Sequence, residues 1–309
     1  MKNLITRTIF GVLFVVIMVG GIVWRPDTFI LLFAIITGMT LWEYTGLVNN
    51  GNAAEREQSQ GEKPNGKKVV VNRFISTVAG VYFFLAVAAL SVGIVDGIGV
   101  FVPYILTILY LFISELYLKH NNPIEDWAYT MLGQMYIAMP FSLINLMAFG
   151  IVDQYSEPSY NWLLPLCLFI FLWANDTGAY CVGSLLGKHK LFPRISPAKS
   201  WEGSIGGAVV VLLIAWGIGT LNNMTVLDAD RQPAQFSAAL GIIEWMGLGA
   251  VVVVFGTLGD LVESLFKRTL GIKDSGNVIP GHGGMLDRFD SSLMAIPAAI
   301  IYLYTIAMV

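Results

Sequence analysis

The sequence has few charged residues. Asp, Glu, Lys and Arg make up 13% of its 309 residues, about half of the roughly 25% that is usual for a soluble domain. Hydrophobic residues make up 56%, and the mean hydropathy is +0.69. This composition excludes an ordinary soluble domain and indicates an integral membrane protein. The formal net charge of -3 decides little, because the placement of charges matters more than their sum in a membrane protein.

Cysteine and histidine are also scarce. The two cysteines, Cys167 and Cys181, lie in one apolar region outside any CxxC or Cys/His pattern. We interpret both as small core residues, and no disulfide framework is indicated. The three histidines include no HExxH spacing, which excludes that zinc motif. The sequence has neither a P-loop GxxxxGK[ST] nor a GxGxxG after a strand, so a nucleotide would bind outside the common soluble folds.

Nine apolar stretches are candidates for the helix of about 20 residues that crosses a bilayer. They cover residues 8–24, 28–48, 74–95, 98–118, 129–151, 162–185, 205–221, 241–264 and 292–309. The sequence therefore predicts an all-α, polytopic membrane protein with about nine transmembrane helices. The first stretch could also be a signal peptide. No clean small-x-small cleavage site follows it, which favours a retained span.

We divide the chain into an N-terminal part, residues 1–160, with about five spans, and a C-terminal catalytic part, residues 161–309. The most polar connection, residues 49–72, is predicted to be a mobile loop because it is rich in polar and charged residues.

The basic residues predict an orientation. With a cytoplasmic N-terminus and nine spans, all but two of the 18 lysines and arginines fall on the cytoplasmic side; the exceptions are Arg25 and Arg231. This asymmetry is what the positive-inside rule demands, and it places the C-terminus outside. The two loops rich in glycine and charge, residues 187–203 and 267–290, then share the cytoplasmic face. We expect a polar active site there.

Three clusters of polar side chains lie in or beside the later spans. They are Asn175, Asp176 and Tyr180 in WANDTGAY, then Asp260, Glu263, Ser264 and Lys267 in GDLVESLFK, and Asp287, Asp290 and Ser291 in DRFDSS. Interhelical hydrogen bonding is the simplest explanation for such groups. It explains Asp260 with Glu263 less well, because two acids on one helical stripe repel each other unless cations balance them. Lys267 or a hard divalent cation could do so.

The two cytoplasmic loops have the composition of a phosphate site. PGHGGMLD offers backbone N–H groups in conformations that glycine allows, with lysine and arginine nearby. A plain re-entrant turn is the alternative. GKHKLFPRISPAKSWEG carries four basic residues that could bind lipid headgroups or a nucleotide triphosphate. Positive-inside signalling alone is the alternative for these charges.

Residues 264–290, SLFKRTLGIKDSGNVIPGHGGMLDRFD, resemble the signature of the phosphatidate cytidylyltransferases, the CDP-diacylglycerol synthases. GDLVES, DTGAY and SPAKSWEG are also similar to segments of that family, and the resemblance runs from Trp173 onward. The usual SPKKTWEG pattern is changed at two positions, where Ala198 replaces the first lysine and Ser200 replaces the threonine. The role of position 198 is therefore in question.

The resemblance implies a multi-pass enzyme of the bacterial inner membrane. Such an enzyme joins CTP and phosphatidic acid to give CDP-diacylglycerol and pyrophosphate, depends on Mg²⁺ with room for a second metal ion, and forms a homodimer. No nucleic-acid partner is expected. By similarity, Asp260 and Asp287 are the metal-binding acids.

On this basis the polar residues take hypothetical roles. Further candidates for metal ligands or their neighbours are Asp290, Glu263 and Asp176. The cations expected to offset phosphate charge are Lys267, Arg268, Lys273 and Arg288. The residues expected at the substrates are Ser196, Lys199, Ser200, His282, Gly283 and Gly284. Phosphoryl transfer needs mostly positioning and charge neutralisation, which suits this set.

Two other functions stay open from the sequence. A CTP-dependent kinase of a polyprenol or similar lipid would use the same nucleotide at the same membrane face. An ion-coupled transporter could use Asp176, Asp260 and Glu263 as coupling sites. The hydropathy shows no inverted repeat, which disfavours the transporter.

Overall fold

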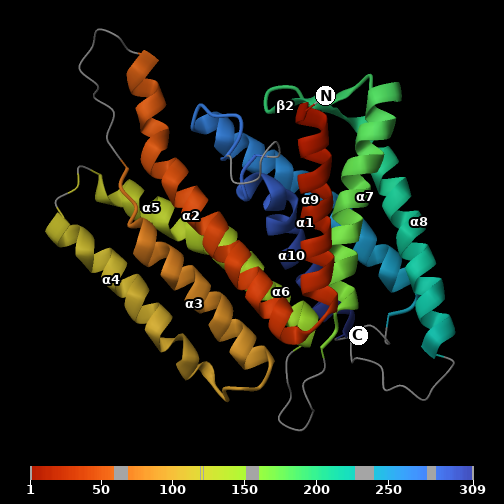
Figure 1. Cartoon of the computed structure of the whole chain (residues 1–309), viewed down its shortest axis with the longest axis horizontal. Coiled ribbons are helices and arrows are strands. Elements are labelled where there is room, and N and C mark those ends of the chain that lie inside the picture. The colour runs from red at the N-terminus through yellow and green to blue at the C-terminus, as the bar shows by residue number, and fades with distance from the viewer. Residues whose placement is uncertain are drawn as a thin grey trace. The chain divides into compact units, whose positions relative to one another are not determined.

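The structure, a computed structural model, describes residues 2–58, 69–118, 120, 122–150, 160–226, 240–276 and 283–307. Over these residues the chain is helical apart from short connections and two short strands (Figure 1). The predicted all-α class is therefore confirmed. Helices dominate because a backbone in lipid must satisfy its own hydrogen bonds, which a helix does within one segment.

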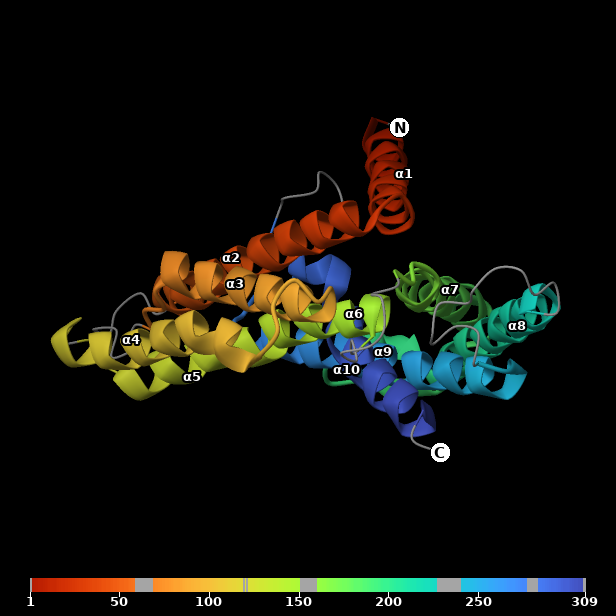
Figure 2. The same ribbon diagram turned by 90° about the horizontal axis from the view of Figure 1, so that it is seen from below.

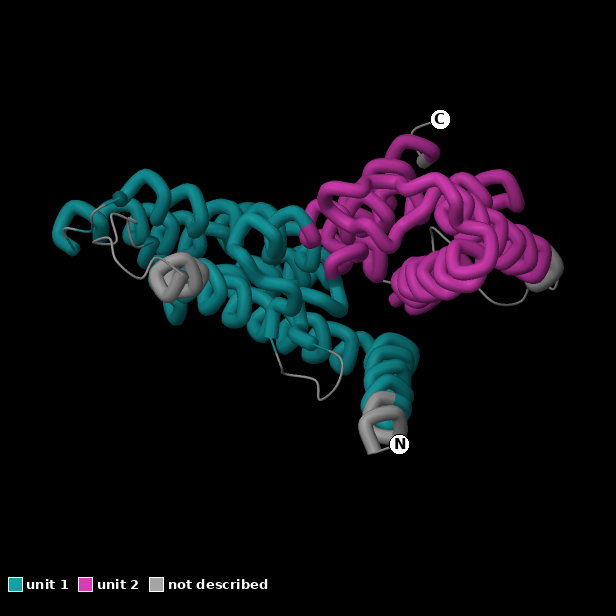
Figure 3. The backbone as a smooth tube through the Cα atoms, turned by 90° about the horizontal axis from the view of Figure 1, so that it is seen from above, with its two compact units in different colours: residues 1–142, 265–289 teal, residues 143–264, 290–309 magenta. Residues whose placement is uncertain are grey.

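The chain forms two compact units (Figure 3). Unit 1 contains residues 1–142 and 265–289, and unit 2 contains residues 143–264 and 290–309. The chain passes from one unit to the other inside three helices, which are α6 (Met139–Phe149), α9 (Ile242–Thr269) and α10 (Leu286–Ala307). The division that we expect at residue 160 between N-terminal and catalytic parts is a functional one and stays a prediction.

Unit 1 is built on the N-terminal helices. They are α1 (Lys2–Val23), α2 (Pro26–Gln58), α3 (Arg73–Ser91), η1 (Ile98–Phe101), α4 (Val102–Leu118), α5 (Pro123–Gly133) and the π-helical turn η2 (Gln134–Ala138). In both views, α2, α3, α4 and α5 lie side by side (Figures 1 and 2). The segment 265–289, far away in sequence, completes the unit.

Local chemistry explains where these helices begin and change. The helix α2 begins with Pro26 and Asp27. A proline is tolerated there because the first N–H groups of a helix have no partner within it, and the positive end of the helix dipole stabilises an acid. The Asn72 side chain caps α3 by accepting a hydrogen bond from the Ile75 N–H. The π turn η2 ends just before Pro140, which cannot donate a backbone hydrogen bond into the preceding turn.

Aromatic rings fill the core of unit 1 and include the distant segment. Phe33, Tyr44, Phe141 and Phe289 are almost completely buried. The Phe141 and Phe289 ring centroids are 5.5 Å apart, and Tyr44 stacks on Phe266 with centroids 5.3 Å apart. These contacts hold residues 265–289 against the N-terminal helices, since aromatic pairs at such spacing stabilise packing beyond the area they bury.

Unit 2 is organised around a tight helix pair. The helices α7 (Leu163–Leu186) and α8 (Trp201–Val226) lie side by side in Figures 1 and 2. A Cβ on Gly178 would lie 3.0 Å from the Cα of Gly207, so small residues allow the backbones to approach. The segment that connects α7 to α8 in the sequence contains two strands, β1 (Lys190–Phe192) and β2 (Ser196–Ser200). They form an antiparallel hairpin, which the sequence analysis does not predict.

Eight helices in the described part of the chain are long and apolar enough to cross a membrane. They cover Pro26–Asn50, Arg73–Ser91, Ile98–Leu118, Pro123–Phe149, Leu163–Leu186, Trp201–Asn222, Ile242–Thr269 and Leu286–Ile306. These correspond to eight of the nine predicted spans. The first prediction, 8–24, corresponds to a shorter apolar stretch, Thr8–Val23, within α1.

Three boundaries differ from the predictions. The last helix begins at Leu286 instead of residue 292, so Asp287 and Asp290 lie in its first turns. The helix α9 continues to Thr269 and includes Lys267 and Arg268. The predicted loop 49–72 begins as helix, because α2 extends to Gln58, and its end is packed, with Val69 and Val71 buried. Residues 59–68 of that loop lie outside the described residues.

Candidate active site

Unit 2 contains a cavity of about 400 Å³. Four residues with predicted metal or substrate roles line it together, namely Asp176, Lys199, Ser200 and Asp260. The remaining lining residues are Asn175, Ala179, Tyr180, Gly183, Ser184, Ala198, Gly203, Ser204 and Thr257. The helices α7, α8 and α9 and the strand β2 thus bring side chains from three separate sequence motifs to one polar cavity.

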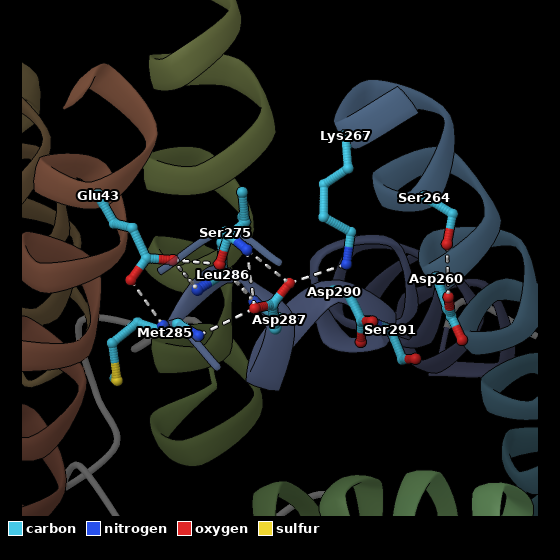
Figure 4. Close-up of polar contacts among 11 residues, drawn as sticks. Glu43, Asp260, Ser264, Lys267, Ser275, Met285, Leu286, Asp287, Asp290 and Ser291 are labelled. Atoms are coloured by element: carbon cyan, nitrogen blue, oxygen red, sulfur yellow. Dashed lines mark hydrogen bonds and ion pairs between the residues drawn. The ribbon is translucent and has the colours of Figure 1, made fainter. Parts of the chain in front are cut away.

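An ion pair joins two of these motifs. The Lys199 Nζ lies 2.5 Å from the Asp260 Oδ2, and both side chains are about one quarter exposed. The other Asp260 oxygen accepts a hydrogen bond of 3.2 Å from the Ser264 hydroxyl, one helical turn later (Figure 4). The i, i+4 relationship predicted for Asp260 and Ser264 is therefore present. Lys199 is the cation beside Asp260.

Two further acids gather with Asp260 in unit 2. The carboxylate of Asp290 interacts electrostatically with those of Asp260 and Asp176. Gly259 makes this possible, since a Cβ there would lie 2.7 Å from the Asp290 carbonyl oxygen. The helices α9 and α10 therefore approach closely at this level. Three carboxylates near one lysine leave an excess of negative charge, which favours a cation.

The donor chemistry of this cluster fits Mg²⁺. Carboxylate oxygens are the ligands that Mg²⁺ prefers, usually one or two from protein with the remaining positions left to water and substrate phosphates. Asp260, Asp290 and Asp176 provide such oxygens. The amide oxygen of Asn175 is buried and has no hydrogen-bond partner among the described residues, so a further oxygen is available beside Asp176.

Two predicted residues of unit 2 lie elsewhere. Glu263, three residues after Asp260 in α9, is completely buried and does not line the cavity. Ser196 pairs with Phe192 in the hairpin and also does not line the cavity. Ser200 is buried, and its hydroxyl accepts a 3.2 Å hydrogen bond from the Gly203 N–H. That bond orients the start of α8 beside the cavity.

Unit 1 contains the second predicted metal acid, Asp287. Its carboxylate lies 2.8 Å from the Lys267 Nζ. It also accepts backbone hydrogen bonds of 2.9 Å from Ser275 and 2.9 Å from Gly284 (Figure 4). Asp287 therefore organises both described sides of the signature loop, 270–276 and 283–286. Lys267, which could have balanced Asp260 or Glu263, is paired with Asp287.

A glutamate that sequence reasoning missed holds the same loop. Glu43 of α2 accepts a hydrogen bond from the Ser275 hydroxyl and from two backbone N–H groups, Met285 at 2.8 Å and Leu286 at 3.1 Å (Figure 4). Only 8% of Glu43 is exposed. Charge-assisted hydrogen bonds of this kind are roughly twice as strong as neutral ones, so Glu43 fixes the loop firmly.

Glu43 also explains two signature glycines. A Cβ on Gly276 would lie 2.9 Å from a Glu43 oxygen, and a Cβ on Gly284 would lie 2.0 Å from the other. Any side chain at either position would displace the carboxylate. The signal in the sequence was a lone acid within the apolar stretch 28–48, since a charge inside a span is costly and usually functional.

The other predicted residues of the signature, residues 264–290, lie in and beside this loop. Arg268, Lys273 and Arg288 are exposed, and none pairs with an acid in the described part of the chain. Gly283 has a φ of 85°, which favours glycine. His282 lies outside the described residues. These three cations, which no described acid pairs with, are available for phosphate oxygens.

Another cluster of potential ligands lies in unit 1. The His120 Nδ1 is 2.8 Å from Glu115 and 3.2 Å from Asp126, and these three residues form a group with metal-ligand spacing. Asp126 also accepts a hydrogen bond of 2.7 Å from the Val70 N–H. Imidazole is not a ligand that Mg²⁺ prefers, so this is not the group that the resemblance calls for. It joins the α4–α5 connection to the segment before α3.

Comparison with known proteins gives several relatives. A phosphatidate cytidylyltransferase of Haemophilus influenzae is 35% identical over 242 residues, covering 75% of this chain and 80% of that protein. One of Bacillus subtilis is 36% identical over 217 residues, covering 70% and 72%. One of Staphylococcus saprophyticus is 40% identical over 184 residues, covering 58% and 65%.

The family comparison covers more of the chain than any of these relatives. The sequence profile described as "Cytidylyltransferase family" matches residues 5–306. The match includes the α2 helix with Glu43 as well as the cavity and the signature loop. The chain therefore belongs to the cytidylyltransferase family.

Proposed function

We propose that this protein is a phosphatidate cytidylyltransferase, which transfers CMP from CTP to phosphatidic acid and releases pyrophosphate. The observation that carries the proposal is the acidic cavity of unit 2, where Asp176, Asp260 and Lys199 meet. Membership of the cytidylyltransferase family and the names of the relatives support it. The expected helices give the enzyme access to a lipid substrate.

In the proposed reaction, a phosphate oxygen of the lipid attacks the α-phosphorus of CTP. The new P–O bond forms as the bond to the β-phosphate oxygen breaks, and pyrophosphate leaves. No general base is required, because a phosphate monoester is already largely ionised near neutral pH. The protein therefore has to position two anionic substrates and offset their charge.

The acids proposed to bind Mg²⁺ are the two that the resemblance names, Asp260 and Asp287. Asp290 and Asp176, the neighbours of Asp260, are the further candidates. When bound, Mg²⁺ would supply positive charge against the triphosphate and the leaving pyrophosphate. A second metal ion is part of the same hypothesis, since more carboxylates are present than one Mg²⁺ usually takes from a protein.

The cations and hydroxyls are proposed to bind the substrates. Lys199 and Ser200 line the cavity, where they would contact the nucleotide or the lipid phosphate. Lys267 would do so less directly, since its ammonium is paired with Asp287. The exposed cations in and beside the signature loop, Arg268, Lys273 and Arg288, would offset charge on pyrophosphate. The remaining proposed substrate contacts are Ser196, His282, Gly283 and Gly284.

Glu43 is proposed to position the signature loop rather than to touch a substrate. Both of its oxygens accept hydrogen bonds from that loop, three in all, so the carboxylate is directed toward the loop. Its effect on the reaction would pass through Asp287, because Ser275 contacts both carboxylates. Site residues held by such a supporting layer stay within the narrow geometry that catalysis needs.

The orientation in the membrane is also a proposal. The positive-inside rule places the N-terminus and the active site in the cytoplasm, where CTP is found, and the C-terminus outside. The similarity to bacterial enzymes supports a location in the bacterial inner membrane. A homodimer remains an expectation from the resemblance alone.

Product analysis tests the proposal. The purified protein is incubated with CTP, phosphatidic acid and Mg²⁺, and lipid and soluble products are measured together. Formation of CDP-diacylglycerol with pyrophosphate supports the proposal. A lipid kinase would instead release CDP, and a transporter would consume no nucleotide.

A further inference from the structure

A mostly apolar cleft of about 370 Å³ lies in unit 1 between α2 and α3. It is lined by Gly38, Met39, Trp42, Glu43, Arg73, Thr77 and Gly276. Six of these residues belong to two membrane-spanning helices, whereas Gly276 belongs to the signature loop. The cleft therefore connects two candidate spans with the loop that Asp287 holds by hydrogen bonds.

One side chain in this cleft, Arg73, has no acidic partner among the residues that the structure describes. Its Nε donates a 2.8 Å hydrogen bond to the Trp42 carbonyl oxygen, and its guanidinium carbon lies 4.0 Å from the centroid of the Trp42 ring. The remaining guanidinium N–H groups suit the bidentate binding of a phosphate.

The guanidinium is also held in place before any ligand arrives. The Trp42 ring stacks on one side, and the backbone at Gly46 approaches so closely that a Cβ there would lie 3.0 Å from the Arg73 Cζ. The cation–π contact restricts the conformations of the arginine side chain before any ligand binds. A preorganised arginine then loses little further entropy when it binds an anion.

Glu43 does not cancel this charge. It lines the same cleft, but it is buried and its two oxygens accept three hydrogen bonds from the signature loop. The Glu43 carboxylate is therefore directed toward the loop. The rest of the lining is nearly all apolar, so the cleft combines an arginine that no described acid pairs with and a surface suited to hydrocarbon.

The cleft runs from the end of a span toward its middle, as a bound lipid would. Arg73 is the first residue of α3 and of its candidate span, Arg73–Ser91, and arginine with tryptophan is typical of the headgroup level of a bilayer. Gly38 and Met39 lie about one turn before Trp42 in α2, toward the middle of the span Pro26–Asn50. Acyl chains could follow that direction while a phosphate stays at Arg73.

We infer that this cleft binds the lipid substrate, a glycerolipid ending in a phosphate monoester, with its phosphate on Arg73 and its chains along Gly38 and Met39. The inference rests on the proposed function and adds a binding site to it. Gly276 at the end of the cleft brings the bound phosphate beside the signature loop. Arg73 is then a substrate-binding residue, outside the signature, that selects the lipid.

The test compares the kinetics of Arg73→Gln and Arg73→Lys with those of the unmodified enzyme, using phosphatidic acid in detergent micelles. Arg73→Gln is expected to raise the KM for phosphatidic acid about tenfold or more, with the KM for CTP and kcat nearly unchanged. Arg73→Lys keeps the charge but not the planar fork, so a smaller increase is expected. Arg25→Gln, at an exposed arginine paired with Asp27, is the matched control and should change neither KM.

A binding measurement accompanies the kinetics. Retention of phosphatidic acid by the purified protein without CTP is measured by native mass spectrometry, with phosphatidylglycerol and inorganic phosphate as competitors. Loss of retention in Arg73→Gln, and weak competition by both, support the inference. A second variant, Met39→Trp, fills the cleft without changing charge and should also raise the KM for phosphatidic acid.

The outcomes separate the two proposals. If the unmodified enzyme makes no CDP-diacylglycerol, the proposed function is wrong. If it does so and Arg73→Gln keeps both the normal KM for phosphatidic acid and normal lipid retention, only the cleft inference is wrong. Equal competition by inorganic phosphate would also overturn it, since the chains would then contribute nothing.

Discussion

Glu43 accepts a hydrogen bond from the backbone N–H of Met285 across 2.8 Å, although 242 residues separate the two in the sequence. The contact links an N-terminal span to the loop that carries the family signature. The N-terminal helices therefore contribute to the site. The helix α2 holds the signature loop through Glu43, and the cleft between α2 and α3 is a candidate site for the lipid.

The Glu43→Gln substitution should reduce kcat by about tenfold or more. The carboxamide keeps one acceptor oxygen, but its NH₂ group would face donors that now bond to a carboxylate, leaving a buried donor unsatisfied. Steady-state kinetics and limited proteolysis of the loop at residues 270–285 would measure the effect. Glu125→Gln, at an exposed position of α5, is the control.

A Glu43 role in positioning also predicts a rescue pattern. Glu43→Asp keeps both acceptor oxygens and should retain more activity than Glu43→Gln, even though it is shorter. Equal loss in both variants, together with an intact loop by proteolysis, would contradict the hydrogen-bonding account.

Asp260→Asn and Asp287→Asn should each reduce the rate by well over about tenfold at saturating Mg²⁺. Each change removes a negative charge from a proposed metal ligand while keeping its size. The rates would be measured with labelled CTP on purified protein. Asp27→Asn, at an exposed acid paired with Arg25, should behave like the unmodified enzyme. Near-normal activity in both active-site variants would contradict the assignment of Asp260 and Asp287 as metal ligands.

Asp290→Asn is expected to act differently, through metal affinity. Asp290 interacts with Asp260 and Asp176, so its neutralisation removes part of the negative charge that attracts a cation. The Mg²⁺ concentration for half-maximal rate should rise about fivefold or more, and excess Mg²⁺ should restore much of the rate. A Mg²⁺ titration of activity, started from chelator-treated enzyme, measures this. An unchanged half-maximal concentration would remove Asp290 from the metal site.

The contact of α7 with α8 makes a prediction about stability. In Gly207→Ala, the new Cβ would lie 2.5 Å from the Asn175 Oδ1 and 2.6 Å from its carbonyl oxygen. Such overpacking should lower the free energy of unfolding by about 1–3 kcal/mol. Gly217→Ala is the matched control in the same helix, since no atom lies within 4 Å of its Cβ. Thermal unfolding in detergent should show a lower Tm for Gly207→Ala and an unchanged Tm for Gly217→Ala.

The spans were predictable because hydrocarbon allows few backbone solutions. Eight of the nine predicted stretches correspond to long apolar helices in the described residues. The predicted start of the last helix, residue 292, is too late, because the charges of DRFDSS interrupt the apolar run on which the prediction depends. Asp287 and Asp290 instead occupy its first turns, where acids are favoured by the helix N-terminus.

The candidate site was only partly predictable. Asp176, Lys199, Ser200 and Asp260 were selected by their cost in a membrane or by resemblance, and they line one cavity. Glu43 and Arg73 are not among the predicted residues. Glu43 is a lone acid in a span, but the sequence does not reveal its partners, which lie more than 230 residues away. The pairing of Lys267 with Asp287 was equally invisible, since helical spacing relates a residue only to its own helix.

The central claim is tested most directly by following the phosphorus atoms of CTP. The purified enzyme is incubated with phosphatidic acid and Mg²⁺, once with CTP labelled at the α-phosphate and once with CTP labelled at the γ-phosphate. We predict that the α-label enters the lipid product, that the γ-label appears in pyrophosphate, and that Asp260→Asn abolishes both. Transfer of the γ-label to lipid with release of CDP, or no transfer of either label, would contradict the account.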